Sequence, residues 1–156
     1  MKTFTLDEAQ ELLPVLESLL NRATEAKQAA VELQEEMAAL VRRIFTSGGM
    51  FIDVAAAQKR KVTLEALVQR VKDALEEIDA SGVQVKDIDT GLLDFPFVLE
   101  GETVLLCWKR GELSINHWHT VESGFQGRQP IDDRFRRRTG STNAGPGNLG
   151  PGNRPN

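Results

Sequence analysis

Residues 91–131 read GLLDFPFVLEGETVLLCWKRGELSINHWHTVESGFQGRQPI, and this stretch decides the second half of the fold. It contains three apolar runs, Leu92–Leu99, Thr103–Lys109 and Leu113–Thr120, separated by short glycine-containing turns. Short apolar runs separated in this way predict antiparallel strands joined by hairpins. Val83–Ile88 also alternates apolar and polar residues just before the stretch. The sequence therefore predicts a small antiparallel meander of three or four strands.

The turns and one proline refine this prediction. Glu100-Gly101-Glu102 is typical of a tight hairpin turn, and Arg110-Gly111-Glu112 predicts a second turn. Pro96 lies inside the first apolar run, where proline favours an edge strand or a bulge. So small a sheet is not stable alone, and we expect it to pack on another element.

Two long helices are predicted ahead of the meander. Thr5 to Glu8 has the pattern of a capping box at the start of the first helix. The second helix is expected over Asp53–Ala80, with Ser81-Gly82 as the signal that ends it. Pro14 is expected to kink the first turns against the rest. The apolar positions of the first helix step by four and three: Leu12, Leu16, Leu19, Ala23, Ala26, Ala30, Leu33, Met37, Leu40 and Ile44. Those of the second are Leu64, Val68, Val71, Leu75 and Ile78. With the break at Thr46–Gly49, the pattern predicts an antiparallel, coiled-coil-like hairpin.

The first helix also has a second, weaker apolar edge. Leu13, Leu20, Val31 and Val41 lie off the main stripe. Such an edge favours a partner, most simply a second copy that completes a four-helix bundle. A dimer is therefore the expected assembly.

Composition and charge set the domain organisation. With 156 residues, 40% of them hydrophobic, the chain suits one α+β domain, predicted over 1–133 with the hairpin at 5–80 and the meander at 83–131. All 23 acidic residues lie before residue 134, whereas five of the 19 Lys and Arg residues lie after residue 133. The acidic body argues against general nucleic-acid binding. Residues 134–156 are Gly-, Pro- and Asn-rich and predict a disordered, solvated tail. Weaker alternatives are that its basic cluster contacts RNA or the acidic helices of the protein itself. This cluster comprises Arg134, Arg136, Arg137 and Arg138.

Cellular location is predicted from two negative features. No run of eighteen apolar residues predicts a membrane span, and the first ten residues lack the apolar core of a signal peptide. The single cysteine, Cys107, cannot form an internal disulfide. A cytoplasmic protein is expected.

Four short motifs in order resemble a known family. GLLDFP, LCWKRGE, WH and GFQGRQPI, together with the early Leu12-Leu13-Pro14, are similar to the bacterial family called domain of unknown function 2203. The resemblance covers roughly residues 3 to 132 and implies no activity. The positions that it marks are Gly91, Asp94, Phe95, Pro96, Trp108, Gly111, Glu112, Trp118, His119, Gly124, Phe125, Gly127, Arg128 and Pro130. His117 lies outside the motif.

Metal binding is one hypothesis for this stretch. His117 and His119 are two residues apart, so on a strand both rings point to the same face. His119 with Glu112, Glu122 or Asp94 offers nitrogen and oxygen ligands for a divalent metal. His117 is a weaker candidate. Polar surface histidines are the alternative, and no cofactor is required by the sequence.

Acid–base catalysis is a second hypothesis. Glu112, His119 and Asp94 could form a carboxylate–imidazole–carboxylate group. Cys107 lies among apolar neighbours, so burial is expected to raise the pKa of its thiol and make it inert as a nucleophile.

Anion binding is a third hypothesis. Gly124 and Gly127 could expose backbone N–H groups beside the Arg128 guanidinium. The structural alternative is a turn in which Phe125 fills the core and Arg128 pairs with Asp94 or Glu122. The candidate polar cluster therefore comprises Asp94, Glu112, His119, Glu122 and Arg128.

Two functions follow from these patterns. The favoured one is a non-enzymatic interaction or self-association module built on the hairpin, with a homodimer or another protein as partner. The alternative is a small metal- or anion-binding protein, with hydrolysis as its reaction, that uses the candidate cluster. Whether the chain is an enzyme stays open at this level.

Overall fold

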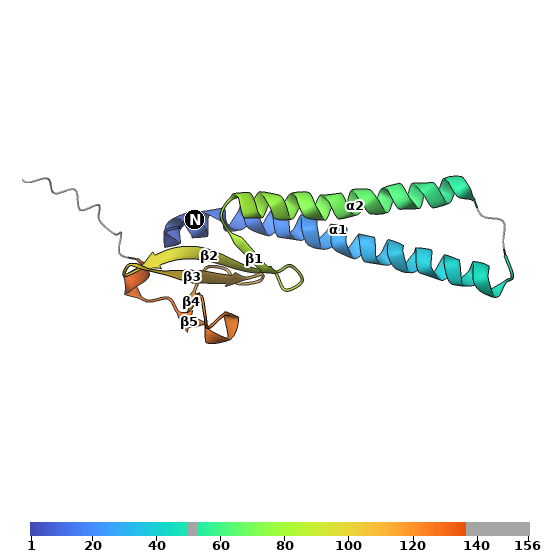
Figure 1. Cartoon of the computed structure of the whole chain (residues 1–156). Helices are drawn as coiled ribbons and strands as arrows, with labels where there is room; N and C mark the ends of the chain where they lie inside the picture. The colour runs from blue at the N-terminus through green and yellow to red at the C-terminus, as the bar shows by residue number, and fades with distance from the viewer. Residues whose placement is uncertain (50–52, 137–156) are drawn as a thin grey trace, which may run out of the picture.

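The computed structural model describes residues 1–49 and 53–136, and these residues form an α+β fold as predicted. Two long antiparallel helices, α1 (Leu6–Thr46) and α2 (Val54–Ala80), lead into a five-stranded sheet. The strands are β1 (Gln84–Asp87), β2 (Leu92–Leu99), β3 (Glu102–Lys109), β4 (His117–Thr120) and β5 (Gln129–Pro130). Two 3-10 turns, η1 (Phe125–Gly127) and η2 (Asp133–Phe135), complete the described chain. The hairpin extends well beyond the sheet at the end where the helices are joined (Figure 1).

Local sequence signals account for the helix ends. The Thr5 hydroxyl accepts from the Glu8 N–H and the Glu8 carboxylate accepts from the Thr5 N–H, which confirms the capping box. The Asp53 carboxylate caps α2 through the Ala56 N–H. Helix α1 is one continuous element through Pro14, so the predicted short first segment is not a separate helix.

The sheet is antiparallel throughout, with its strands in sequence order. It has one more strand than the upper limit of the prediction, because residues 129–130 pair with β4. The third predicted run is only half a strand. Leu113–Asn116 form a loop, and only residues 117–120 pair with β3.

The prediction that Pro96 marks an edge strand or a bulge is wrong for the strand order, because β2 lies between β1 and β3. Strand β1 pairs with β2 only as far as Asp94, and the bulge lies in β1, between Val85 and Asp87. Beyond β1 the Pro96 carbonyl accepts from the Phe4 N–H. Proline is tolerated because its missing donor falls where the neighbouring strand has ended.

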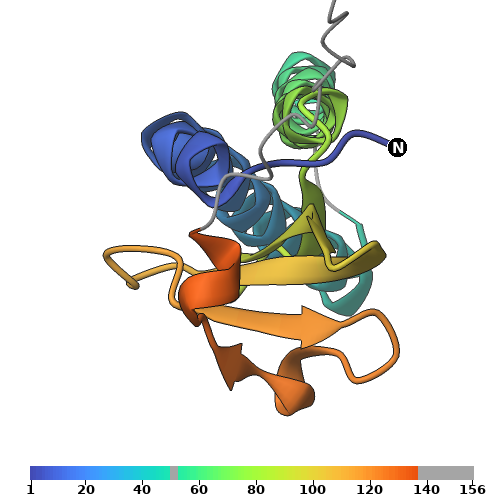
Figure 2. The ribbon, with the colours of Figure 1, turned by 90° about the vertical axis from the view of Figure 1, so that its left-hand side faces the viewer.

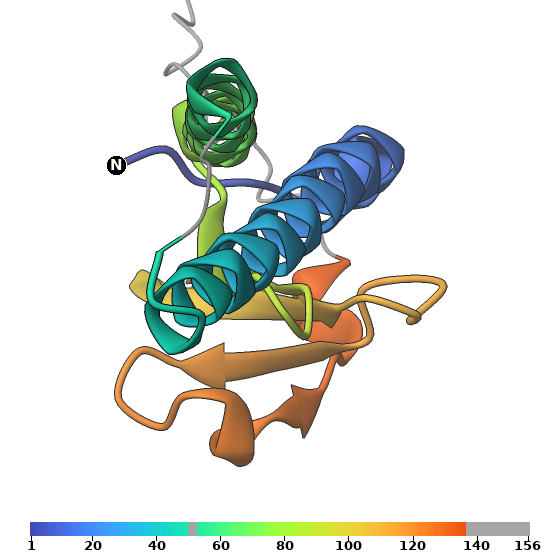
Figure 3. The same cartoon turned by 90° about the vertical axis from the view of Figure 1, so that its right-hand side faces the viewer.

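One face of the sheet forms the core with the helices. Side chains alternate along a strand, so Leu93, Phe95 and Phe97 of β2 share this face with Leu106 and Trp108 of β3. Trp118 of β4 joins the same cluster. Helix α1 lies across this face, and α2 packs alongside α1 on the side of β1 (Figures 2 and 3).

The second apolar edge of α1 divides into two parts. Leu13 and Leu20 are buried in the core cluster that includes the sheet, so a second copy cannot cover them. Val31 and Val41, farther along the same helix, are exposed. The predicted free edge is therefore correct only for the distal part of α1.

The folded region continues past the predicted boundary at residue 133. Phe135 in η2 is buried against Phe97 and Trp118, with ring centroids 5.0 and 5.4 Å away. Arg134 pairs with Asp132 and lies over the Trp118 ring. Arg134 thus belongs to the folded body and not to a tail. The disorder predicted for residues 137–156 lies outside the described residues.

Within the described ranges, neither helix carries an apolar segment of the length and hydropathy needed to cross a bilayer.

Candidate functional site

The candidate site lies on the face of the sheet opposite the helices. Asp94 of β2 pairs in register with Cys107 of β3, which in turn pairs with His117 of β4. His119 lies two residues along β4 and pairs with Leu105. All these side chains point to the same face, because directly paired residues in an antiparallel sheet share a side.

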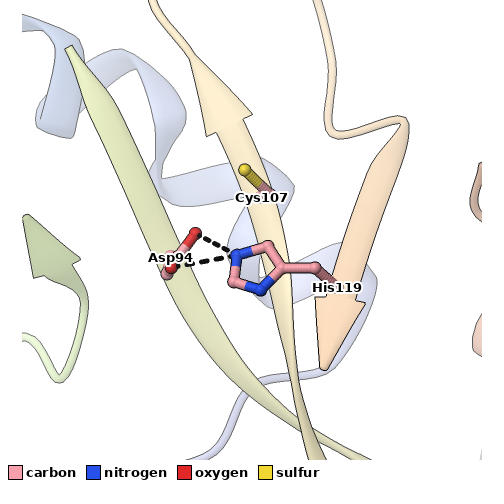
Figure 4. A group of neighbouring side chains, drawn as sticks. All are labelled: Asp94, Cys107 and His119. Atoms are coloured by element: carbon pink, nitrogen blue, oxygen red, sulfur yellow. Dashed lines mark hydrogen bonds and ion pairs between the residues drawn. The ribbon is translucent and has the colours of Figure 1, made fainter. Parts of the chain in front are cut away.

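Asp94 and His119 form a buried pair across three strands. Their exposed fractions are 1% and 2%. The His119 Nε2 atom lies 3.1 Å from both carboxylate oxygens of Asp94. The imidazole extends from β4 over β3 toward β2 (Figure 4). The pair therefore ties together strands that are not hydrogen-bonded to each other.

The other nitrogen of the ring fixes the proton count of this pair. His119 Nδ1 lies 2.8 Å from the Thr120 carbonyl oxygen, which only accepts, so Nδ1 carries a hydrogen and donates. The Nε2 lone pair of a neutral ring would then face a carboxylate. One positive charge must lie between Nε2 and Asp94, either as a shared proton or as a bound cation.

Cys107 completes this group. Its Sγ, an Asp94 oxygen and a His119 ring nitrogen all lie within 4.8 Å of one another. Burial raises the pKa of the Cys107 thiol to about 12, and the nearby Asp94 carboxylate adds to the increase. The predicted burial of Cys107 is confirmed, and the direction of its pKa agrees with the expectation. Sequence reasoning did not consider Cys107 as a metal ligand.

Glu112 and Arg128 form a second, separate group. The Arg128 Nη2 atom donates to Glu112 Oε1 over 2.6 Å, and the same oxygen accepts from the Lys109 N–H. Trp108 Nε1 donates to the Glu112 carbonyl. The expected pairing of Arg128 with Asp94 or Glu122 is therefore wrong, because Glu112, at the end of the β3 turn, is nearer. This pair fixes the segment after β4 to the end of β3.

The remaining predicted residues lie apart from the buried pair. His117 Nδ1 is 3.4 Å from Glu112 Oε2, without hydrogen-bond geometry. Glu122 is exposed in the turn after β4. The predicted group of Glu112, His119 and Asp94 is therefore divided, since Glu112 pairs with Arg128 while His119 pairs with Asp94.

The anion-binding hypothesis for residues 124–128 loses one of its two glycine amides. The Gly127 N–H bonds to the Gly124 carbonyl, and the Arg128 N–H bonds to the Phe125 carbonyl, so η1 itself uses both of these amides. Phe125 is 40% exposed and lies under the Arg128 guanidinium, 4.8 Å from it, so it does not fill the core.

A pocket of about 390 Å³ opens beside the buried pair. Its lining includes Asp94, His119, Leu105 and Phe125. Gln84, Lys86 and Thr103 contribute polar groups to its lining. The arrangement gives a small ligand or water access to one side of the pair.

A family model described as "Uncharacterized conserved protein (DUF2203)" matches residues 2–131, most of the chain. The chain belongs to this family. The match agrees with the resemblance predicted over roughly residues 3 to 132. No curated protein and no solved structure matches the chain.

In this DUF2203 chain, the glycines of two motifs have clear physical reasons. Gly91 has a φ of +69°, and a Cβ there would lie 2.6 Å from the Arg110 Cβ. The close approach places the Arg110 N–H on the Gly91 carbonyl and the Arg110 side chain on Thr24 of α1. Gly111, at φ +98°, makes the turn that presents Glu112 to Arg128. Sequence reasoning missed the Arg110–Thr24 link, since nothing local to either residue indicates it.

Proposed function

We propose that the protein is a non-enzymatic self-association module whose distal hairpin pairs with that of a second copy. We define the distal hairpin as residues 31–46 and 54–71. The observation that carries the proposal is its exposed apolar surface, since large hydrophobic side chains lie open on both helices. They are Val31, Val41, Phe45, Val54, Val62 and Val68.

The seam of the distal hairpin is itself incompletely covered. Leu33, Met37, Leu40 and Ile44 of α1 and Leu64 of α2 are only half-buried. Two helices alone bury one stripe each and leave its margins in water. A second hairpin packed on the same side would complete a four-helix bundle and cover these margins.

Charge along the hairpin favours an antiparallel pair. The tip, residues 40–49 and 53–62, carries Arg42, Arg43, Lys59, Arg60 and Lys61 against Asp53 alone, a net charge of +4. The stem, residues 24–39 and 63–79, carries nine acidic and three basic residues, a net charge of −6. Antiparallel packing places each basic tip along the acidic stem of the other copy, whereas parallel packing places like charges together. The proposed dimer is therefore two-fold symmetric and antiparallel.

A charge-reversal experiment tests this arrangement. Lys59→Glu with Arg60→Glu and Lys61→Glu takes the net charge of the tip from +4 to −2. Glu25→Lys with Glu32→Lys, Glu35→Lys and Glu36→Lys takes that of the stem from −6 to +2. Each multiple variant alone is expected to dimerise at least about tenfold more weakly than the wild type, because like charges then face each other. An equimolar mixture is expected to recover a dimer, because both tip–stem contacts are again complementary.

The control is Glu102→Lys, an exposed change at the start of β3 that is expected to leave the molar mass unchanged. Light scattering of each variant and of the mixture provides the measurement. A mixture that stays monomeric, with both variants folded by circular dichroism, would contradict the antiparallel dimer. A wild-type chain that is monomeric but binds a different protein through the tip would replace self-association with a heterologous partner.

The cytoplasm is the location that we propose, since a single, unpaired and buried thiol suits a reducing compartment. Fractionation of the native host with detection of the untagged chain tests this, and recovery outside the cytoplasm would contradict it.

A further inference from the structure

We propose that Asp94, Cys107 and His119 form a three-ligand site for Zn²⁺, with the fourth position open to the adjoining pocket. The three donors come from three successive strands and lie within 4.8 Å of one another (Figure 4). This site goes beyond the proposed self-association, because it lies on the sheet and uses no residue of the distal hairpin.

The spacing suits a tetrahedral ion. Ligand atoms 2.0–2.3 Å from a tetrahedral Zn²⁺ are separated from one another by roughly 3.2–3.8 Å. The His119 Nε2 atom is 3.1 Å from each Asp94 oxygen, close to that range. The sulfur lies within 4.8 Å of the other two ligand atoms, about 1 Å beyond the upper end of that range at most.

The orientation of His119 is that of a metal ligand. Ligating histidines commonly donate their second ring N–H to a carbonyl or carboxylate, which fixes the tautomer and aims the free lone pair at the metal. His119 Nδ1 donates to the Thr120 carbonyl in this way, and Nε2 is left to face Asp94. A cation between Nε2 and the carboxylate resolves the contact of two electron pairs.

The charge count also fits a buried divalent ion. Without metal, the thiol is neutral and one proton lies between His119 and Asp94, so the group is neutral. A bound Zn²⁺ displaces that proton and the thiol proton, and two protons leave to solvent. The resulting set of Zn²⁺, thiolate, carboxylate and neutral imidazole is again neutral. No net charge is therefore buried when the ion enters.

The donor set selects the metal. Thiolate and imidazole nitrogen favour Zn²⁺ over Mg²⁺ or Ca²⁺, which prefer oxygen ligands. Three protein ligands with an accessible fourth position are the pattern of zinc sites that hold water or a small ligand, whereas structural sites usually have four protein ligands. Asp94 and His119 both line the pocket, so the fourth ligand enters from there.

Cobalt substitution gives the most direct test, because a thiolate bound to Co²⁺ produces a charge-transfer band in the near ultraviolet. The full chain, without an affinity tag, is stripped with chelator and titrated with CoCl₂ and then ZnCl₂. We expect one Co²⁺ per chain, the charge-transfer band, the intense visible bands of four-coordinate cobalt, and displacement by one equivalent of Zn²⁺. Cys107→Ala is expected to abolish the charge-transfer band.

A comparison of two histidine variants distinguishes Zn²⁺ bound at this site from Zn²⁺ bound elsewhere on the surface. His119→Ala is expected to weaken Zn²⁺ binding on the order of 100-fold or more, since loss of even an outer-shell partner costs 10–100-fold. His117→Ala, on the same strand and face, is expected to keep wild-type affinity. Circular dichroism shows which variants fold, and the wild-type spectrum decides the question even where a variant does not fold.

A folded wild-type chain without the charge-transfer band at saturating Co²⁺ would overturn the site, and the Asp94–His119 pair would then be a proton-sharing link between strands. Equal loss of affinity in the two histidine variants would overturn it as well. Either result would leave the dimer test unaffected, since that test reads molar mass and involves other residues.

Discussion

The proximal half of the hairpin, which is the part next to the sheet (residues 6–30 and 72–80), and the distal hairpin have the same sequence pattern but different surroundings. All eight buried residues of α1 lie from Ala9 to Ala30. Five of them, Ala9, Leu13, Leu16, Leu19 and Leu20, belong to the core cluster that includes the sheet. Beyond Ala30 the same four-and-three spacing continues to Ile44, but those residues are only half-buried. Helix α2 repeats the contrast, since only Ala74 and Ile78, near its sheet end, are buried.

Lengths explain the contrast. Helix α1 has 41 residues and is therefore roughly 60 Å long, whereas the longest strands have eight residues and span about 26 Å. The sheet cannot reach the distal half. Apolar spacing thus predicts which face of a helix packs against another element. The length of the sheet decides how much of that face is buried within the chain.

The largest expected effect is at the proximal end, in the buried pair. His119→Ala, measured by urea unfolding in the presence of chelator, is expected to cost about 3–5 kcal/mol, because it leaves Asp94 buried without a partner. His117→Ala, on a half-exposed side chain, is expected to cost less than about 1 kcal/mol. An equal loss of unfolding free energy in the two variants would contradict a distinct stabilising role for the Asp94–His119 pair.

The next effect compares two leucines of α1. Leu20→Ala, in the core cluster, is expected to lower the free energy of unfolding by about 2–5 kcal/mol. Leu40→Ala, in the half-buried distal seam, is expected to cost about 1 kcal/mol in dilute protein. Denaturant titration at low concentration measures both, and a distal cost as large as the proximal one would break the comparison.

A smaller effect concerns association only. Phe45 is 88% exposed, so Phe45→Ser is expected to change the unfolding free energy by less than about 0.5 kcal/mol. The same change is expected to weaken the dimer about tenfold, which corresponds to about 1.4 kcal/mol. Leu113→Ser is the control, since Leu113 is also exposed but lies in the loop between β3 and β4. Equal weakening by both variants, in sedimentation equilibrium, would contradict a distal interface.

The smallest effect is an acid dependence confined to the proximal unit. The backbone N–H groups of Asp89 and then Thr90 hold the pKa of Asp87 below its usual 3.8. A carboxyl whose pKa is lower in the folded state stabilises it above the unfolded value and loses that contribution as pH falls through the folded pKa. Asp87→Asn is therefore expected to melt at a lower temperature than the wild type at neutral pH, and the gap is expected to close well below pH 3.8. A gap that persists in acid would show that Asp87 acts through packing.

Much of the fold follows from local signals. The capping box at Thr5, the apolar spacing along both helices and the glycine turns predicted the two helices and the hairpin of β2 and β3. The turn itself is one residue shorter than predicted, because Glu102 already pairs with Leu99. The predicted turn of residues 100–102 would pair Asp94 with Trp108, whereas the two-residue turn Glu100-Gly101 pairs it with Cys107. The hairpin could be predicted from the sequence, but its register depends on this single residue.

The register of β4 could not be predicted from the sequence. A turn at residues 110–112 would pair His119 with Thr103, but the longer loop to Asn116 shifts the pairing to Leu105, which lets the ring reach Asp94. Arg128 likewise pairs with Glu112 because the tertiary structure places η1 beside the end of β3, and no local sequence signal indicates that placement. The burial of Leu13, Leu20 and Phe135 depends on which surface covers each residue, and local spacing carries no such information.

Molar mass as a function of concentration tests the central claim most directly. The claim is that a second copy of the chain buries the apolar surface of the distal hairpin, as the sheet buries that of the proximal half. Multi-angle light scattering of the untagged wild-type chain is expected to rise toward twice 17.3 kDa through the micromolar range. A mass that stays at 17.3 kDa at the highest concentration, with the chain folded, would contradict it.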